Sequence, residues 1–67
     1  MVQILYMKYS ELIRRLEQGG WVVFSQKGSH MKMKHPDFDN ILIVPNHTSK
    51  EIGKGLALSI LKQAGII

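Results

Sequence analysis

The sequence predicts an α+β domain of αβββα order, in which two helices pack on one face of a three-stranded antiparallel sheet. Two apolar stripes with helical spacing lie near the ends of the 67-residue chain, at residues 9–16 and 57–64. Between them, one segment alternates strictly between two kinds of side chain, which is typical of a strand with one buried face. Short connections between these segments favour antiparallel neighbours.

The first helix is predicted from an apolar repeat at i, i+3, i+4 and i+7, formed by Tyr9, Leu12, Ile13 and Leu16. Ser10 is the expected N-cap, because its hydroxyl can accept a bond from a free backbone N–H of the first turn. Gly19 and Gly20 are expected to end the helix.

The three strands follow at residues 21–26, 29–34 and 41–45. A two-residue turn at Lys27-Gly28 is expected to join the first two, and residues 36–40 to form the next turn. In the second strand, the alternation places Ser29, Met31 and Met33 on one face. His30, Lys32 and Lys34 lie on the opposite face. We expect the methionine face to pack on the helices, the His/Lys face to lie open, and the third strand to be mostly buried.

The second helix has a less distinct start. Residues 48–51 match a capping box, but Gly53 and Gly55 each cost about 1 kcal/mol relative to alanine inside a helix. We therefore expect a short turn at 48–52 and a helix at 54–64 that ends at Gly65. Its core stripe consists of Ala57, Ile60, Leu61 and Ala64.

The charge balance indicates a polyanionic partner. Nine Lys/Arg against five Asp/Glu give a net charge of +4, which favours nucleic acid, an acidic protein or an anionic membrane. The chain has no cysteine, which excludes disulfides and thiolate metal sites. This suits a reducing compartment, and we expect a cytoplasmic protein without a signal peptide or membrane span.

The most informative segment is Lys27-Gly28-Ser29-His30. It places an imidazole beside a run of lysines, where it is a candidate general acid or base acting on a phosphodiester. In an arbitrary small protein, the same histidine would be an exposed strand residue without a role.

These residues also carry a family resemblance. The chain resembles the HicA toxins of bacterial and archaeal toxin–antitoxin systems, most specifically at residues 26–30. The matching segments are Met7-Lys8-Tyr9-Ser10-Glu11-Leu12-Ile13, Gly20-Trp21, Gln26-Lys27-Gly28-Ser29-His30, Lys34-His35-Pro36, Val44-Pro45-Asn46-His47, Gly55 and Ile60-Leu61-Lys62-Gln63-Ala64-Gly65-Ile66. A departure is Gly53, where the family often has proline. Residues 1–6 are interpreted as an N-terminal extension and residues 7–67 as a single HicA-like domain.

The resemblance implies a double-stranded-RNA-binding-domain-like fold and a metal-independent endoribonuclease that cleaves mRNA, with His30 as the catalytic residue. It also implies inhibition by a HicB-like antitoxin. RNA supplies its own nucleophile, the 2′-OH, so a positioned histidine and cations suffice for the chemistry. The expected RNA-binding residues are Lys27, Gly28, Ser29, Lys32, Lys34 and His47, and no cofactor or metal is expected.

The residues leave several alternatives open. The chain is either the ribonuclease, a non-catalytic RNA-binding module, or a protein-interaction domain with a basic docking face. His47 is a second acid/base or RNA contact, or else a structural residue at the start of the second helix. His35 is interpreted as solvated or phosphate-contacting, and Trp21 as a core anchor.

Overall fold

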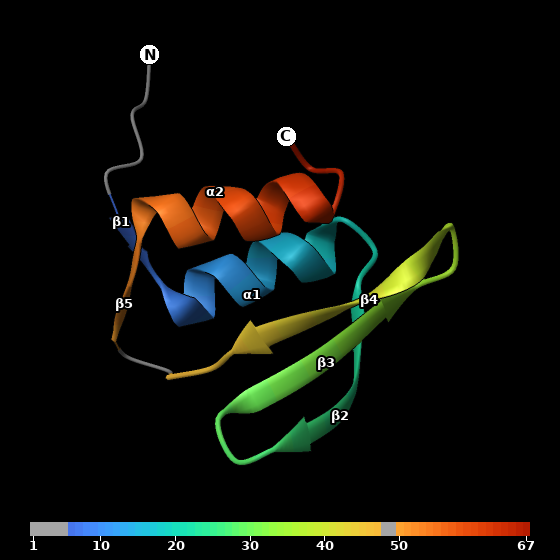
Figure 1. Cartoon of the computed structure of the whole chain (residues 1–67), viewed down its shortest axis with the longest axis horizontal. Coiled ribbons are helices and arrows are strands. Elements are labelled where there is room, and N and C mark those ends of the chain that lie inside the picture. Colours follow the sequence, from blue (N-terminus) through green and yellow to red (C-terminus); the bar gives the residue numbers. More distant parts are fainter. Residues whose placement is uncertain (1–5, 48–49) are drawn as a thin grey trace.

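Two helices and five strands follow one another in the computed structural model, which describes residues 6–47 and 50–67, with Tyr6 described in its backbone only (Figure 1). The elements in chain order are β1 (Tyr6–Lys8), α1 (Tyr9–Gln18), β2 (Val22–Lys27), β3 (His30–His35), β4 (Phe38–Pro45), β5 (Glu51–Gly53) and α2 (Lys54–Gln63).

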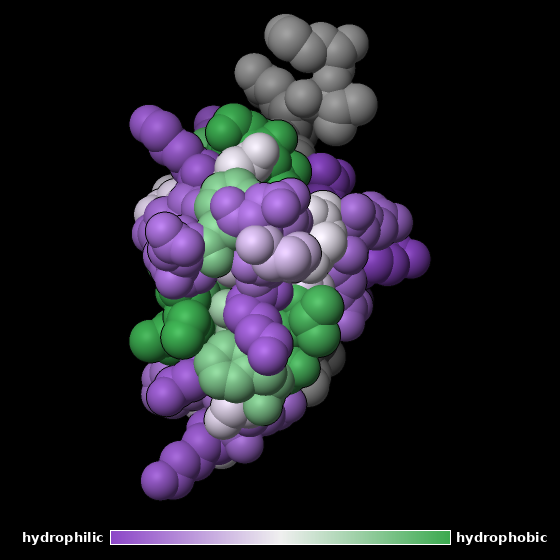
Figure 2. All heavy atoms as spheres, turned by 90° about the vertical axis from the view of Figure 1, so that its right-hand side faces the viewer, coloured by the Kyte–Doolittle hydropathy of each residue, from purple (hydrophilic) through white to green (hydrophobic). Residues whose placement is uncertain are grey.

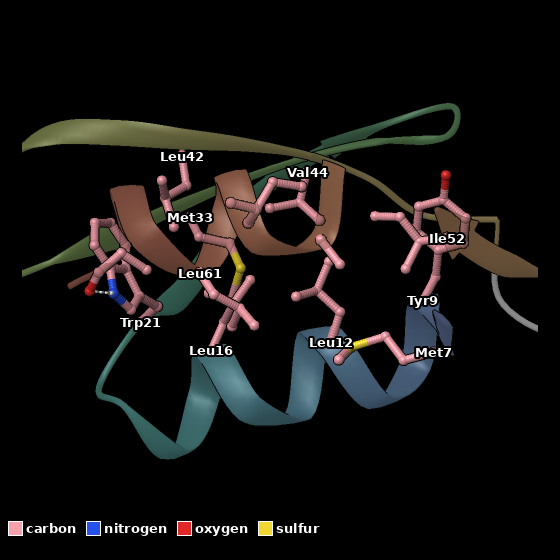
Figure 3. Packing of buried hydrophobic residues seen from close by; sticks show 13 residues of the cluster. Met7, Tyr9, Leu12, Leu16, Trp21, Met33, Leu42, Val44, Ile52 and Leu61 are labelled. Carbon is pink, nitrogen blue, oxygen red and sulfur yellow. Dashed lines mark hydrogen bonds between the residues drawn. The ribbon is translucent and has the colours of Figure 1, made fainter. Parts of the chain in front are cut away.

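The main sheet has the order β2-β3-β4, and both of its pairings are antiparallel. Helices α1 and α2 run side by side and cover one face of this sheet (Figures 1 and 3). The predicted fold class is therefore confirmed, and neither helix of the described residues covers the other face of the three-stranded sheet.

A second, two-stranded sheet was missed by the sequence analysis. Strands β1 and β5 pair antiparallel, with Met7 opposite Ile52, next to the starts of both helices. The turn predicted at 48–52 is thus wrong over its last two residues, and β1 begins at Tyr6, the last residue assigned to the extension. Strands of three residues are too short to show an alternation, and their pairing joins distant parts of the chain. The remaining capping-box residues, Thr48 and Ser49, lie outside the described residues.

Helix α1 begins one residue before the predicted cap. The N-cap is Lys8, without a side-chain cap, and Ser10 already lies in the first helical turn. The backbone explains this difference, because the β1–β5 pairing fixes Lys8 in an extended conformation and the N–H of Tyr9 donates to the carbonyl of Lys50 at 3.1 Å. The predicted end at Gly19 and Gly20 is confirmed, and Gly20 has a φ of 99°.

The core lies between the helices and the main sheet (Figure 3). Trp21 closes one end of it, with 1% of its surface exposed, and its indole N–H donates to the carbonyl of Ala64 at 3.1 Å. This confirms Trp21 as a core anchor, although it precedes β2 instead of starting it. The buried cluster consists of Met7, Tyr9, Leu12, Leu16, Trp21, Met33, Leu42, Val44, Ile52, Ala57, Ile60, Leu61 and Ala64.

Candidate active site on the open face of the sheet

The side chains of β3 divide between the two faces of the sheet as the alternation predicts. Met31 and Met33 are buried on the helix side, with 5% and 0% exposure. His30, Lys32 and Lys34 are exposed on the opposite face. Because β3 is the central strand, this row of cationic and titratable groups runs along the middle of the open face.

The β2–β3 hairpin places His30 beside Lys27. The turn consists of Gly28 and Ser29, one residue later than predicted, so that Lys27 and His30 are directly opposite each other. Residues opposite each other on antiparallel strands share a face, with Cβ atoms about 5 Å apart. An imidazole and an ammonium group therefore project from neighbouring positions at this end of the sheet.

Gly28 permits this tight turn through its backbone conformation. Its φ is 61°, which side-chain-bearing residues rarely adopt, whereas a Cβ added there would meet no atom within 4 Å. The carbonyl of Ser29 accepts a 2.6 Å bond from the N–H of Asn46, which fastens the turn to the chain beyond β4. Lys27 and His30 thus flank a turn that is fixed by the β2–β3 pairing and by the hydrogen bond from Asn46.

The imidazole of His30 is free to meet a ligand. Within residues 6–47 and 50–67, no hydrogen bond or ion pair engages its ring, and the side chain is exposed. The residue opposite His30 on the neighbouring strand β4 is Pro45, which contributes no N–H. The surroundings of His30 on this face are therefore open and cationic.

The outer strands add an apolar character that the sequence analysis missed. The third strand was predicted to be mostly buried, yet Ile41 and Ile43 are 52% and 59% exposed. The reason is that β4 alternates like β3: Leu42 and Val44 fill the core, and Ile43 lies opposite Lys32 on the open face. Asp39 and Asn40, assigned to a turn, lie within β4, which begins at Phe38.

On β2, Val22 and Phe24 are also exposed, at 56% and 44%. Val22 lies opposite Lys34, whose Nζ lies 5.5 Å from the centroid of the Phe24 ring. Seen from the end of the molecule that carries the β3–β4 turn, green hydrophobic surface is interrupted by purple hydrophilic side chains (Figure 2). The open face is thus a cationic row with apolar flanks, a pattern visible in the sequence only once the strand register is known.

His47 does not share the position of His30. Its ring contacts Tyr9 edge-on, with centroids 5.2 Å apart, on the helix side of the sheet. Its backbone carbonyl accepts a bond from the N–H of Lys50 at 3.0 Å. The ring remains exposed to solvent, at the rim of the domain.

His35 is a structural residue, so its interpretation as a solvated or phosphate-contacting side chain is wrong. Its Nδ1 accepts the N–H of Asp37 at 3.0 Å, and its Nε2 lies 3.0 Å from the carbonyl of Gly19. Both contacts are satisfied when Nε2 carries the proton, a tautomer inferred from the network. The ring also packs on Trp21 and Phe38, with centroids 5.3 and 4.9 Å away. In the sequence, the signal for this structural role is weak: Phe38 follows His35 by three residues, whereas Trp21 is distant along the chain.

Among the described residues, 6–47 and 50–67, no three His, Asp or Glu side chains are placed to hold a metal ion together. None of the helices in this part of the chain is long and apolar enough to cross a membrane.

Comparison with known proteins defines the class to which this fold and open face belong, the small toxins of toxin–antitoxin pairs. The family described as "HicA toxin of bacterial toxin-antitoxin" matches residues 9–66. The chain belongs to this HicA toxin family, as the resemblance predicted.

Two relatives support this membership. A protein of Pseudomonas fluorescens (strain Pf0-1), named "Probable mRNA interferase HicA", is 42% identical over 60 residues, which cover 90% of this chain and 97% of the relative. A solved structure titled "HicA3 and HicB3 toxin-antitoxin complex" contains a chain that is 37% identical, with a TM-score of 0.72. The match covers 91% of this chain and 97% of that one.

Proposed function

We propose that this protein is the toxin of a type II toxin–antitoxin system and a metal-independent endoribonuclease that cleaves mRNA, with His30 as general acid/base. The observation that carries the proposal is the exposed imidazole of His30 beside Lys27, at the end of a row that continues with Lys32 and Lys34. The names of the relatives, a probable mRNA interferase and a toxin–antitoxin complex, support it.

The chemistry is transesterification within the RNA. His30 takes the proton of a 2′-OH, and the 2′-oxygen attacks the adjacent phosphorus. The bond from phosphorus to the 5′-oxygen breaks, and because the site is open to solvent, a water molecule protonates the leaving oxygen. The hydroxide that remains takes the proton back from His30, which restores the neutral imidazole. The products are a 2′,3′-cyclic phosphate and a 5′-hydroxyl. No metal is required, since the nucleophile belongs to the substrate and lysines supply the positive charge.

The neighbouring residues bind the RNA. Lys27 and Lys32 flank His30 on the same face and neutralise the charge that develops on the phosphorane, while Lys34 holds the backbone further along. Gly28 and Ser29 give the phosphate close access to the turn. His47, exposed two residues after Pro45, lies to the side of this face against Tyr9 and contacts RNA that extends past the edge of the sheet.

The same face is the binding site for a HicB-like antitoxin. An active ribonuclease in the cytoplasm must be neutralised, and a partner with acidic groups facing Lys27, Lys32 and Lys34 would exclude RNA from His30. The toxin–antitoxin complex formed by the structural relative supports such a partner.

The decisive experiment replaces His30 by alanine. His30→Ala is expected to abolish cleavage of a defined mRNA, with a loss of about 10²-fold or more, while RNA affinity stays within about threefold. Lys62→Ala, which removes an exposed cation of α2 away from the open face, is the matched control and should cleave normally. Products with a 3′-hydroxyl and a 5′-phosphate would refute the mechanism. Normal cleavage by His30→Ala would refute the assignment of His30.

A further inference from the structure

The open face continues beyond the residues assigned above to an exposed aromatic ring. We propose that Phe24 and Lys34 form a nucleobase-stacking subsite, and that the enzyme therefore binds its substrate as single-stranded RNA. The identity of the ligand as RNA rests on the proposed function, but the subsite itself rests on the geometry of β2 and β3.

A β-bulge brings Phe24 to this face. The pairing of β2 with β3 steps from Val23 opposite Met33 to Ser25 opposite Lys32, which leaves Phe24 as an additional residue without a partner of its own. A bulge turns the affected side chains and is common where a sheet edge carries function. Here it leaves a phenyl ring 44% exposed on the edge strand, although the same ring buried in the core would be more stabilising.

Lys34 supplies the second half of the subsite. Its ammonium group lies 5.5 Å from the centroid of the Phe24 ring, and its backbone is paired with Val22. Because this ammonium group lies over one side of the ring, a base would stack on the opposite side, and the phosphate of that nucleotide would lie near the ammonium group. Aromatic rings that stack bases, combined with cations that follow the backbone, are the usual means by which proteins bind single strands.

The distance from the Phe24–Lys34 subsite to His30 fits one continuous strand of RNA. His30 and Lys34 are four residues apart on β3, which corresponds to about 13 Å at ~3.3 Å per residue. At ~3.4 Å per stacked nucleotide, at most about four nucleotides separate the base on Phe24 from the phosphate at His30. Lys32 lies between the two positions on the same face. A single short segment of RNA can therefore occupy both ends.

Stacking on Phe24 selects against duplex RNA. In a duplex, each internal base already stacks on its neighbours, and its edges are paired. A base can reach a protein ring only after it has left the helix, which single-stranded RNA permits without that cost.

Binding of fluorescent RNA by the cleavage-deficient His30→Ala protein tests this subsite, because the RNA then stays intact. In this background, Phe24→Leu removes the aromatic ring and keeps an apolar side chain. We expect it to weaken binding of a 12-nucleotide single strand about tenfold, and Phe24→Trp to preserve binding within about threefold. Binding of a 12-base-pair duplex should change by less than about twofold.

Val22→Ala is the matched control. Val22 is exposed on the same face of the same strand but has no aromatic ring, and its loss should change single-strand affinity by less than about twofold. Equal single-strand affinity of the Phe24→Leu protein and its parent would overturn the proposal, as would equal losses for single strand and duplex. An effect on antitoxin binding alone would also overturn it, since Phe24 would then belong to a protein-docking surface.

Failure of this inference can be distinguished from failure of the proposed function. If the wild-type protein cleaves RNA but Phe24→Leu binds and cleaves normally, only the stacking subsite is refuted. If the wild-type protein cleaves no RNA but Phe24→Leu selectively loses single-strand affinity, the subsite stands and the nuclease is refuted.

Discussion

The two ends of β3 each carry a histidine, and the two side chains have opposite surroundings. His30 is exposed on the open face, and no hydrogen bond or ion pair of the described residues holds its ring. His35 is held by the carbonyl of Gly19 and the N–H of Asp37, and it packs against Trp21. A ring whose nitrogens are both occupied connects segments of the chain, whereas an unoccupied ring on a solvent-exposed face can exchange protons with a substrate.

A glycine with positive φ accompanies each of these histidines, for different reasons. Gly28, in the turn before His30, has open space where a Cβ would be. At Gly20 a Cβ would lie 2.6 Å from the Nε2 of His35. The glycine near His30 thus permits only a backbone conformation, while the one near His35 also permits a close approach of side chain to backbone.

The largest expected effect comes from alanine at Gly20. Gly20→Ala adds backbone strain at a φ of 99° and pushes the His35 ring away from the carbonyl of Gly19. We expect a loss of about 3 kcal/mol in the free energy of unfolding, combining the strain with the lost hydrogen bond and ring packing. Gly28→Ala should lose only about 1 kcal/mol, from strain alone.

Thermal unfolding followed by circular dichroism measures this difference. For a domain of this size, the Gly20→Ala protein should melt about 10 °C below the Gly28→Ala protein. Equal melting temperatures would show that the His35 ring moves aside without loss of stability. The proposed difference between the two ends of β3 would then be wrong.

The next largest effect concerns the histidines themselves. His35→Ala removes ring contacts with Trp21 and Phe38 together with two hydrogen bonds, for an expected loss of about 2 kcal/mol. His30→Ala removes an exposed side chain and should change stability by less than about 0.5 kcal/mol. Urea denaturation gives both values. A His30→Ala protein as unstable as His35→Ala would mean that His30 supports the fold, and its effect on cleavage could no longer be attributed to chemistry.

The sequence predicts the elements with local periodicity well. The stripe that includes Leu12 and Leu16 marks α1, and the strict alternation from Met31 to Lys34 identifies both the core face and the open face of β3. In these segments, the neighbours that decide burial are within a few residues along the chain, so the pattern is complete in the sequence.

Features that depend on distant contacts were not predictable in this way. The β1–β5 pairing joins residues about 45 positions apart in strands of three residues, and the role of His35 depends on the carbonyl of Gly19, 16 positions away. The exposure of Phe24 depends on a bulge whose position appears only in the strand register. Within the candidate site, the row on β3 was predictable because it lies on one strand, whereas its apolar flanks belong to two others.

The smallest expected effect distinguishes His30 from the third histidine, His47. His47→Ala loses the edge contact with Tyr9, which should cost about 1 kcal/mol in stability. If His47 contacts RNA only at the rim, affinity falls by about two- to fivefold, while the rate of cleavage of bound RNA is unchanged. His47→Phe sharpens the test, because a phenyl ring retains the contact with Tyr9 but cannot exchange a proton. Single-turnover cleavage at saturating protein should therefore be normal in His47→Phe. A rate of cleavage more than about tenfold lower in this variant would make His47 the second proton carrier, and His30 would then not be the only catalytic histidine.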